Sequence, residues 1–192
     1  MRIVGGTFKG RALKAPSSQA VRPTPDRARE ALFNILAHND ELFAEGQGLE
    51  GATVIDLFAG TGALGLEALS RGAAFALFVD MSIEGRGLIR ENMLACGVAA
   101  RARLFKRDAT KIGARGKMER ATLAFLDPPY GKGLGDKALA VLDEGDWLAP
   151  DALVIVEESA KADLAIPKAF QTLQTRIMGE TQLWFLRYKT EP

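Results

Sequence analysis

Short apolar runs of strand length alternate with longer amphipathic stretches from residue 52 onward. The apolar runs predict strands at 53–58, 75–80, 102–108, 121–127 and 152–159. The amphipathic stretches predict helices at 64–72, 83–97 and 136–148, and a short polar helix between 109 and 120. Strands that alternate with helices in this way are typical of a doubly wound, mainly parallel sheet.

The first 50 residues follow a different pattern. Residues 2–15 contain two short strand-like runs around the turn GGTFKG, which predicts a hairpin. A helix is predicted over 26–39, where apolar side chains recur on one side. Thr24 suits the N-cap of this helix, Pro25 its first position and Asp26 its first turn.

The C-terminal residues 170–189 predict two further strands joined by the turn MGET. This closing hairpin would add an antiparallel strand at one edge of the sheet. We therefore expect an α/β fold with a seven-stranded, mainly parallel sheet, one antiparallel edge strand, and a small N-terminal hairpin and helix.

The composition is typical of a soluble single-domain protein, with 192 residues, of which 47% are hydrophobic and 26% charged. No apolar run approaches the roughly 20 residues that span a bilayer, and the N-terminus lacks the apolar core of a secretory signal. The single cysteine, Cys96, excludes an internal disulfide and fits the reducing cytoplasm. One cysteine and one histidine cannot form a common metal cage, so we expect no metal. A monomer is the default expectation for this size.

Charge is unevenly distributed, although the net charge is only +1. Residues 1–29 hold seven basic residues and one acidic residue, a local balance of +6, which leaves −5 on the remainder of the chain. A basic arm on a mildly acidic body indicates a polyanionic partner. A solvated, lysine-rich edge hairpin that resists aggregation would explain the same charges equally well.

A glycine-rich loop lies between the first strand of the alternating region and the helix that follows it. Gly60-x-Gly62-x-x-Gly65 matches the dinucleotide-binding fingerprint, and Asp80 follows Gly60 by 20 residues. Taken alone, this pattern fits an NAD-binding unit. It is a weak signal, because small loop residues and a ribose-binding acid serve several ligands.

Two further acids favour a ligand other than a dinucleotide. Asp56, inside the first strand, would repel a pyrophosphate but suits a ligand with an ammonium or sulfonium group, and S-adenosylmethionine (SAM) carries both. Asp108 and Ala109 follow the third strand, where a carboxylate can accept a hydrogen bond from an adenine amino group. We expect Asp56, Asp80 and Asp108 to line one crevice at the carboxyl edge of the sheet. The alternative is that Asp56 and Asp108 only cap helices or turns.

Asp127-Pro128-Pro129-Tyr130 ends the fourth strand beside the same crevice. The exocyclic amine of a nucleobase is a poor nucleophile, because its lone pair is delocalised into the ring. Hydrogen bonds from that amine to the Asp127 carboxylate and the Pro128 carbonyl would localise the lone pair, and the prolines hold the turn rigid. Tyr130 offers an aromatic face on which a base can stack. The alternative is an ordinary proline-rich turn with Tyr130 half-buried.

These motifs resemble those of a known group of enzymes. The pattern D-x-F-A-G-T-G together with DPPY looks like the SAM-dependent amino-methyltransferases that act on nucleic acid. The segments RIVGGTFKGR, RPTPDRAREALFNIL and FAGTGALGLEALSRGA are similar to the bacterial family that methylates guanine N2 in 16S ribosomal RNA, the RsmD family. Pro25 stands where members of that family often have Thr, and Tyr130 where Phe is common.

The resemblance implies a Rossmann-like SAM-dependent methyltransferase fold and transfer of a methyl group from SAM to a guanine N2 amine, usually that of guanine 966. It implies 16S rRNA in the assembling 30S subunit as the partner. Residues 1–48 would form a basic RNA-binding extension, and residues 49–192 the methyltransferase domain.

The family motifs transfer to this chain residue by residue. The implied cofactor-binding residues are Asp56, Phe58, Ala59, Gly60, Thr61, Gly62, Asp80, Asp108 and Ala109. The implied catalytic residues are Asp127, Pro128, Pro129 and Tyr130. The implied RNA-binding residues are Lys9, Arg11, Arg22, Thr24 and Arg27. The last three belong to the RPT-x-DR motif, for which helix capping and ion pairing are the alternative explanation.

Three other functions are alternatives. An adenine-N6 DNA methyltransferase uses a similar turn, but the N-terminal arm leaves no room for its usual target-recognition region. An NAD(P)-dependent oxidoreductase would need a catalytic Lys/Tyr or His array near the crevice, and the only histidine, His38, lies far upstream. A non-catalytic RNA-binding assembly factor would not need Asp80 and Asp127.

Overall fold

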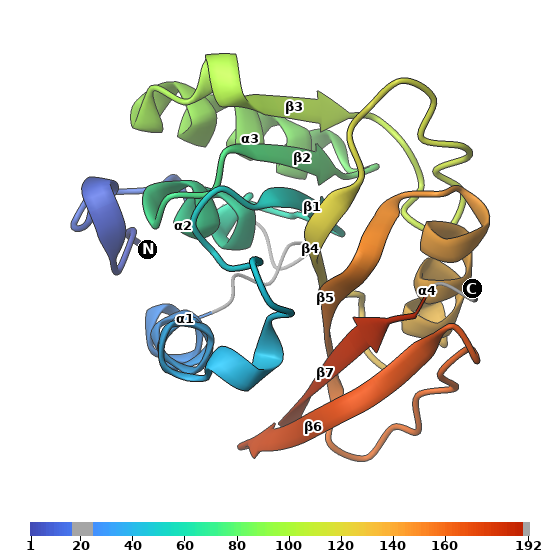
Figure 1. The fold of residues 1–192 in the computed structure, drawn as a ribbon. Helices are drawn as coiled ribbons and strands as arrows, with labels where there is room; N and C mark the ends of the chain where they lie inside the picture. The colour runs from blue at the N-terminus through green and yellow to red at the C-terminus, as the bar shows by residue number, and fades with distance from the viewer. Residues whose placement is uncertain (17–24, 190–192) are drawn as a thin grey trace.

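The computed structural model describes residues 1–16 and 25–189. A seven-stranded sheet runs through the centre of the molecule in the order β3-β2-β1-β4-β5-β7-β6 (Figure 1). Its strands are β1 (Thr53–Leu57), β2 (Phe75–Val79), β3 (Ala102–Phe105), β4 (Ala121–Leu126), β5 (Leu148–Ser159), β6 (Phe170–Met178) and β7 (Thr181–Tyr188). β7 runs antiparallel to β5 and β6, whereas the other neighbours are parallel. The predicted seven-stranded, mainly parallel sheet is confirmed. Its antiparallel strand is β7, which lies between β5 and the edge strand β6.

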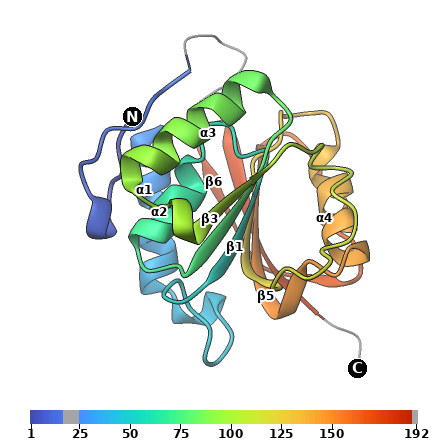
Figure 2. The ribbon, with the colours of Figure 1, turned by 90° about the horizontal axis from the view of Figure 1, so that it is seen from above.

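Helices cover both faces of the sheet. The α-helices of the described residues are α1 (Asp26–His38), α2 (Ala63–Ser70), α3 (Ile83–Cys96) and α4 (Leu134–Glu144). α1, α2 and α3 lie on one face, and α4 lies on the other (Figure 2). Within the described residues, no helix is long and apolar enough to cross a membrane.

The side chains of β1 alternate between the two faces of the sheet. Val54 packs into the core on the side of α1, α2 and α3, whereas Ile55 and Leu57 pack into the core on the side of α4. Because successive side chains of a strand point to opposite faces, Asp56 shares the face of Val54 and points toward α2. Burying a carboxylate in a strand that is otherwise apolar has a desolvation cost. An aspartate at this position therefore indicates a role other than core packing.

The N-terminal segment belongs to the same core. Ile3 and Phe33 are fully buried, and the ring of Phe33 lies 5.7 Å from that of Phe125 in β4. A buried ion-pair network adds to this packing: the carboxylate of Glu67 in α2 lies 3.5 Å from Nε of Arg29 in α1, and both side chains are fully buried. The division into an RNA-binding extension and a methyltransferase domain therefore stays a prediction about function.

The predicted hairpin over residues 2–15 is confirmed in a short form. A single antiparallel bridge joins Arg2 and Ala12, and the amides of Ile3 and Leu13 donate to the carbonyls of Arg11 and Met1 at 2.9 and 3.0 Å. A 3-10 turn at Gly6–Phe8 lies between the two arms. The turn of this hairpin docks on the end of α2, where the Ser70 hydroxyl donates to the carbonyl of Gly5 and accepts from the amide of Phe8 at 2.9 Å. These contacts fix the turn against α2.

The short polar helix predicted between residues 109 and 120 is absent. Gly113 and Gly116 have φ angles of 70° and 66°, a left-handed conformation that a right-handed helix cannot contain. The segment is held by long-range contacts instead, such as the hydrogen bond of 2.7 Å from Nε1 of Trp147 to the carbonyl of Gly113.

Two helix ends also differ from the prediction. α4 ends at Glu144 rather than at residue 148, because Leu148 pairs with Ala121 of β4 in the sheet. Pro25 is the N-cap of α1 rather than its first residue, and the predicted N-cap, Thr24, lies outside the described residues.

Candidate active site at the carboxyl edge of the sheet

A cavity of about 880 Å³ opens where the parallel strands end. Most of the predicted site residues line it, namely Asp56, Phe58, Ala59, Gly60, Thr61, Asp80, Asp108, Ala109, Asp127, Pro128, Pro129 and Tyr130. They come from β1 and from the loops that follow β1, β2, β3 and β4. The structure thus brings the glycine-rich loop, the three strand-end acids and the DPPY turn together around one space.

The glycine-rich loop makes a tight turn between β1 and α2. Phe58, Gly60 and Gly62 have φ angles of 59°, 55° and 76°, and the amide of Gly62 donates to the carbonyl of Ala59 at 2.7 Å. Gly62 is the N-cap of α2 and does not line the cavity. A Cβ on Gly65 would lie 2.4 Å from the ring of Phe78, so only glycine lets α2 start this close to the sheet.

Asp56 is 1% exposed, and its Oδ2 accepts a hydrogen bond of 3.0 Å from the amide of Gly65 in the first turn of α2. Burial raises the pKa of Asp56 to about 8, against the opposing effect of that hydrogen bond. Asp56 therefore caps a helix, as the alternative interpretation held, and also faces the cavity. A cation in the cavity would favour its ionised form.

Asp80 ties the glycine-rich loop to the start of α3. Its Oδ2 accepts from the amide of Gly60 at 2.8 Å, and its Oδ1 accepts from the amide of Ser82 at 2.7 Å. Each carboxylate oxygen has a second lone pair, so the side chain can still accept hydrogen bonds from ligand hydroxyls.

Asp108 forms a local turn after β3. Its Oδ1 accepts from the amide and the hydroxyl of Thr110 at 2.8 and 2.7 Å, and these hydrogen bonds lower the pKa of Asp108. The neighbouring Ala109 is buried. Asp108 is thus ionised at neutral pH and is both a turn-forming residue and part of the cavity wall.

The DPPY turn follows β4. Asp127 is half-buried, Pro128 is buried and Pro129 is exposed. The hydroxyl of Tyr130 donates to Glu157 of β5, and this contact fixes the far end of the ring. Burial, together with the hydrogen bond to the Glu157 carboxylate, raises the pKa of Tyr130, which keeps the hydroxyl protonated.

Two walls of the cavity were not anticipated. One comes from α1 and its N-cap and includes Pro25, Ala28 and Leu32. The other comes from β5, β6 and β7 and includes Glu157, Met178, Glu180, Thr181 and Leu183. The motif RPT-x-DR marks the start of α1, so it offered a signal for the first wall. The strands at the second wall carry no motif.

The residues that the resemblance assigns to RNA lie outside the cavity where they are described. Lys9, Arg11 and Arg27 are exposed, and Arg22 and Thr24 are outside the described residues. Arg11 donates to the carbonyl of Ala95 at 2.5 Å, near the C-terminal end of α3 and away from the cavity.

Asn92 of α3 connects the N-terminal arm to the glycine-rich loop. Its fully buried side-chain amide donates to the carbonyl of Thr61 at 2.9 Å and to that of Lys14 at 3.2 Å, and its Oδ1 accepts from the amide of Lys14 at 2.7 Å. One side chain thus fixes both segments.

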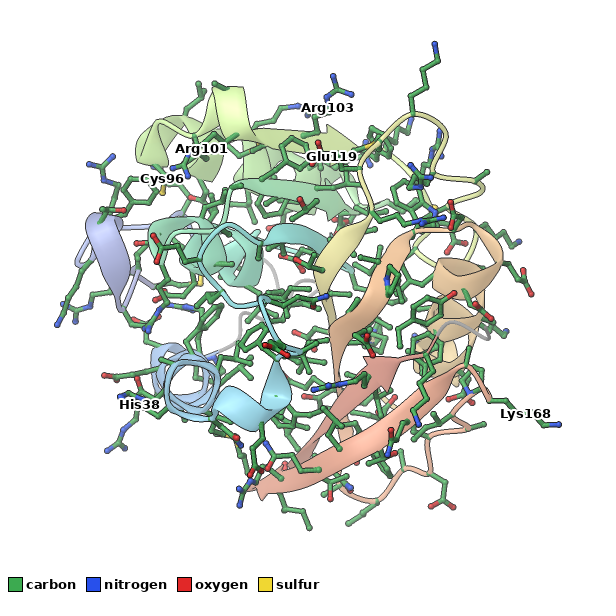
Figure 3. All side chains as sticks on the ribbon, viewed as in Figure 1. His38, Cys96, Arg101, Arg103, Glu119 and Lys168 are labelled. Atoms are coloured by element: carbon green, nitrogen blue, oxygen red, sulfur yellow. The ribbon has the colours of Figure 1, made fainter. Side chains whose placement is uncertain are left out.

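The remaining candidate groups offer no catalytic array. His38 lies on the outer side of α1 (Figure 3), where its Nδ1 contacts the carbonyl of Asn34 at 2.9 Å. Cys96 is buried. Among residues 1–16 and 25–189, no three His, Cys, Asp or Glu side chains are placed to hold a metal ion.

A family model described as "Conserved hypothetical protein 95" matches residues 1–187. The chain is 36% identical to ribosomal RNA small subunit methyltransferase D of Escherichia coli over 181 residues, which cover 94% of this chain and 86% of that protein. It is 30% identical to the protein of the same name from Haemophilus influenzae over 184 residues, which cover 93% and 89% of the two chains.

Solved structures have the same fold. The structure of yhhF from Escherichia coli matches with a TM-score of 0.82 and 31% identity, covering 100% of this chain and 99% of that chain. An RNA methyltransferase from Salinibacter ruber in complex with S-adenosyl-L-homocysteine matches with a TM-score of 0.65, covering 89% and 96% of the two chains. Its identity is 16%, so it bears on the fold alone.

Proposed function

The chain belongs to the family of ribosomal RNA small subunit methyltransferase D, and we propose that it transfers a methyl group from SAM to the N2 amine of a guanine in 16S ribosomal RNA. By the family resemblance, that guanine is guanine 966 and the substrate is the assembling 30S subunit. The observation that carries the proposal is that two motifs share one cavity: the glycine-rich loop with Asp56, and the DPPY turn at residues 127–130.

SAM fits the residues on the glycine-loop side of the cavity. Among the described side chains, none forms an ion pair with the buried Asp56, so the ammonium and sulfonium of SAM would supply the missing positive charge. Asp80 would accept hydrogen bonds from the ribose hydroxyls and Asp108 from the adenine amine. The cavity volume also falls within the range of roughly 300–1,000 Å³ that is usual for small-molecule sites.

The DPPY turn supports chemistry at an amino nitrogen. When bound, SAM supplies a methyl group that its sulfonium has already activated. The Asp127 carboxylate and the Pro128 carbonyl would accept hydrogen bonds from the guanine amine, which localises the lone pair on N2. Because N2 becomes acidic once it is methylated, its proton can leave afterwards and Asp127 need not be a strong base.

Tyr130 would hold the base beside Asp127. The guanine must leave its stack to enter the cavity, at a cost of a few kcal/mol, and stacking on Tyr130 would offset about 1–3 kcal/mol of that cost. The catalytic contribution of the chain is then mainly the orientation of N2 toward the methyl group.

The test is methyl transfer from labelled SAM to three acceptors: 30S subunits and naked 16S rRNA from cells that lack the gene, and DNA. We expect N2-methylguanosine in the small-subunit RNA, identified by mass spectrometry of its nucleosides. Methylation of DNA adenine instead would establish the adenine-N6 alternative. Calorimetry that detects binding of NAD and not of SAM would overturn the proposed donor.

A further inference from the structure

The connection between β3 and β4 carries positive charge that the proposed chemistry does not use. Residues 101–120 hold eight basic and two acidic residues, a balance of +6. Together with residues 1–29 they contain 15 of the 25 basic and 3 of the 24 acidic residues of the chain. The remaining residues therefore hold 10 basic and 21 acidic residues, a balance of −11. The positive charge of the molecule is concentrated in two segments.

Four cations of the second segment face solvent. Arg103, Lys106, Lys111 and Lys117 are exposed, and Figure 3 shows Arg103 extending away from the outer edge of the sheet. No carboxylate of the described residues lies within the 4.0 Å of an ion pair from any of the four cationic groups. These four residues form the β3–β4 basic surface, whose cationic groups have no carboxylate partner among the described residues.

The backbone beneath the β3–β4 basic surface is held in place although it forms no helix. Ile112 is 1% exposed and packs into the core on the side of α4. Arg115 and Arg120 both form ion pairs with Asp146, at 2.7 and 2.6 Å. Connections of this length without a helix are uncommon in compact domains and usually have a function.

The two basic segments lie on opposite faces of the sheet. The N-terminal segment packs on the side of α1, α2 and α3, whereas residues 106–120 pack on the side of α4 (Figure 2). Asp108 and Thr110, which line the cavity, lie between Lys106 and Lys111 in the chain. A nucleic acid strand whose base enters the cavity would therefore run past this segment.

We propose that the β3–β4 basic surface binds phosphate groups of the RNA substrate, on the face of the sheet opposite the N-terminal arm. Phosphate contacts position a protein on nucleic acid without reading its sequence, which suits lysines and arginines that protrude from a fixed backbone. The inference rests on the proposed function, because it takes RNA as the substrate.

The test compares two variants with the same change in net charge. Arg103→Ser/Lys106→Ser removes two charges from the β3–β4 basic surface. Lys168→Glu makes the same change at an exposed site in the loop between β5 and β6, well away from Arg103 (Figure 3). Binding of naked 16S rRNA to each full-length variant is measured at several salt concentrations. Calorimetry with SAM and a thermal unfolding curve serve as checks of the fold.

We expect the double variant to bind the RNA about tenfold more weakly near 0.1 M salt, with a dependence of log Kd on log salt that is shallower by about 1–2. Its KM for RNA should rise, whereas kcat and the Kd for SAM stay unchanged. Lys168→Glu should behave like the wild type.

Two results would overturn the proposal: unchanged RNA affinity and salt dependence in the double variant, or an equal loss in Lys168→Glu. The binding measurement does not require methyl transfer. If the wild type binds the RNA without methylating it, the proposed function fails, while the comparison of variants still reports on the surface.

Discussion

The hydroxyl of Tyr130 donates a hydrogen bond to Oε1 of Glu157 across 2.5 Å. The two residues belong to different elements, since Tyr130 ends the DPPY turn and Glu157 lies in β5. A contact of 3.1 Å with Oγ1 of Thr181 connects the same hydroxyl to β7. The hydroxyl end of the ring is therefore held by two strands, and the residue lines the cavity.

Tyr130→Phe keeps the ring and removes this anchor. A hydrogen bond to a charged group contributes about 1.5–3 kcal/mol, so we expect methyl transfer to fall about tenfold while the Kd for SAM stays unchanged. Tyr130→Ala should lose a further factor of about ten or more, because the stacking face is gone. Single-turnover kinetics measure both effects.

Tyr188→Phe is the matched control, because its hydroxyl donates to the carboxylate of Asp143 at 2.7 Å outside the cavity. It should transfer methyl groups at the wild-type rate. Equal losses in Tyr130→Phe and Tyr188→Phe would contradict a specific role for the Tyr130 anchor.

Asp127→Asn tests the proposed localisation of the amine lone pair. The amide is a weaker acceptor and can present its NH2 group to the amine, so we expect kcat to fall by about 10²-fold or more. The Kd for SAM should stay within about twofold of the wild type, since the glycine-rich loop is untouched. The control is Asp151→Asn, which changes an exposed aspartate near the start of β5, at the opposite end of that strand from Glu157. This variant should be neutral. Normal turnover in Asp127→Asn would refute the assignment.

Asp56→Asn should change the pH dependence of stability in the absence of ligand. The pKa of Asp56 rises from 3.8 to about 8 on folding, so between these values the folded state holds a proton that the unfolded chain lacks. The free energy of unfolding of the wild type therefore falls as pH rises through this window. We expect the variant to match the wild type near pH 4 and to exceed it at pH 8, with a Tm difference of roughly 2–4 °C for each kcal/mol. Calorimetric scans at pH 4 and pH 8 measure the difference.

The same ionisation should appear in SAM binding. If a cationic donor binds the ionised Asp56, the wild type should bind SAM more tightly as pH rises toward about 8 and should release a proton on binding. Calorimetry in buffers of different ionisation enthalpy detects that proton. Asp56→Asn should bind SAM weakly at every pH. Tight, pH-independent binding by the variant would show that Asp56 does not contact the donor.

Glu67→Met should test the buried network between α1 and α2. The change leaves Arg29 buried without its Glu67 partner, and removing one partner of a buried pair costs about 3–5 kcal/mol. Arg29→Met/Glu67→Met removes both charges and should recover a large part of that loss. Thermal unfolding of both variants is the measurement. A double variant as unstable as the single one would mean that the residues act through packing rather than charge.

The acids of the cavity could be predicted from the sequence because parallel strands end at the same edge. Asp56, Asp80 and Asp108 each lie in or directly after a strand that the apolar pattern marks, so their convergence follows from the fold class alone. The DPPY turn follows a strand of the same sheet, and its position beside the glycine-rich loop follows in the same way.

The other parts of the cavity depend on contacts between distant segments. Leu32 and Leu183 reach it from α1 and β7, and local periodicity does not say where those elements pack. The residues between β3 and β4 look helical by their polar pattern, yet the left-handed glycines and the contact with Trp147 exclude a helix. Tertiary structure overrides local preference at such sites.

The burial of Ile3 and Phe33 means that the basic arm is not a detachable module. A shortened chain that starts at residue 49 would expose the apolar surface on which these side chains pack and would leave Glu67 without the amide of Val4 and the guanidinium of Arg29. A truncated chain would therefore lose RNA binding because it does not fold, and the experiment would not measure RNA recognition by the arm. The role of the arm in recognition has to be dissected by point substitutions at exposed positions such as Lys9 and Arg27.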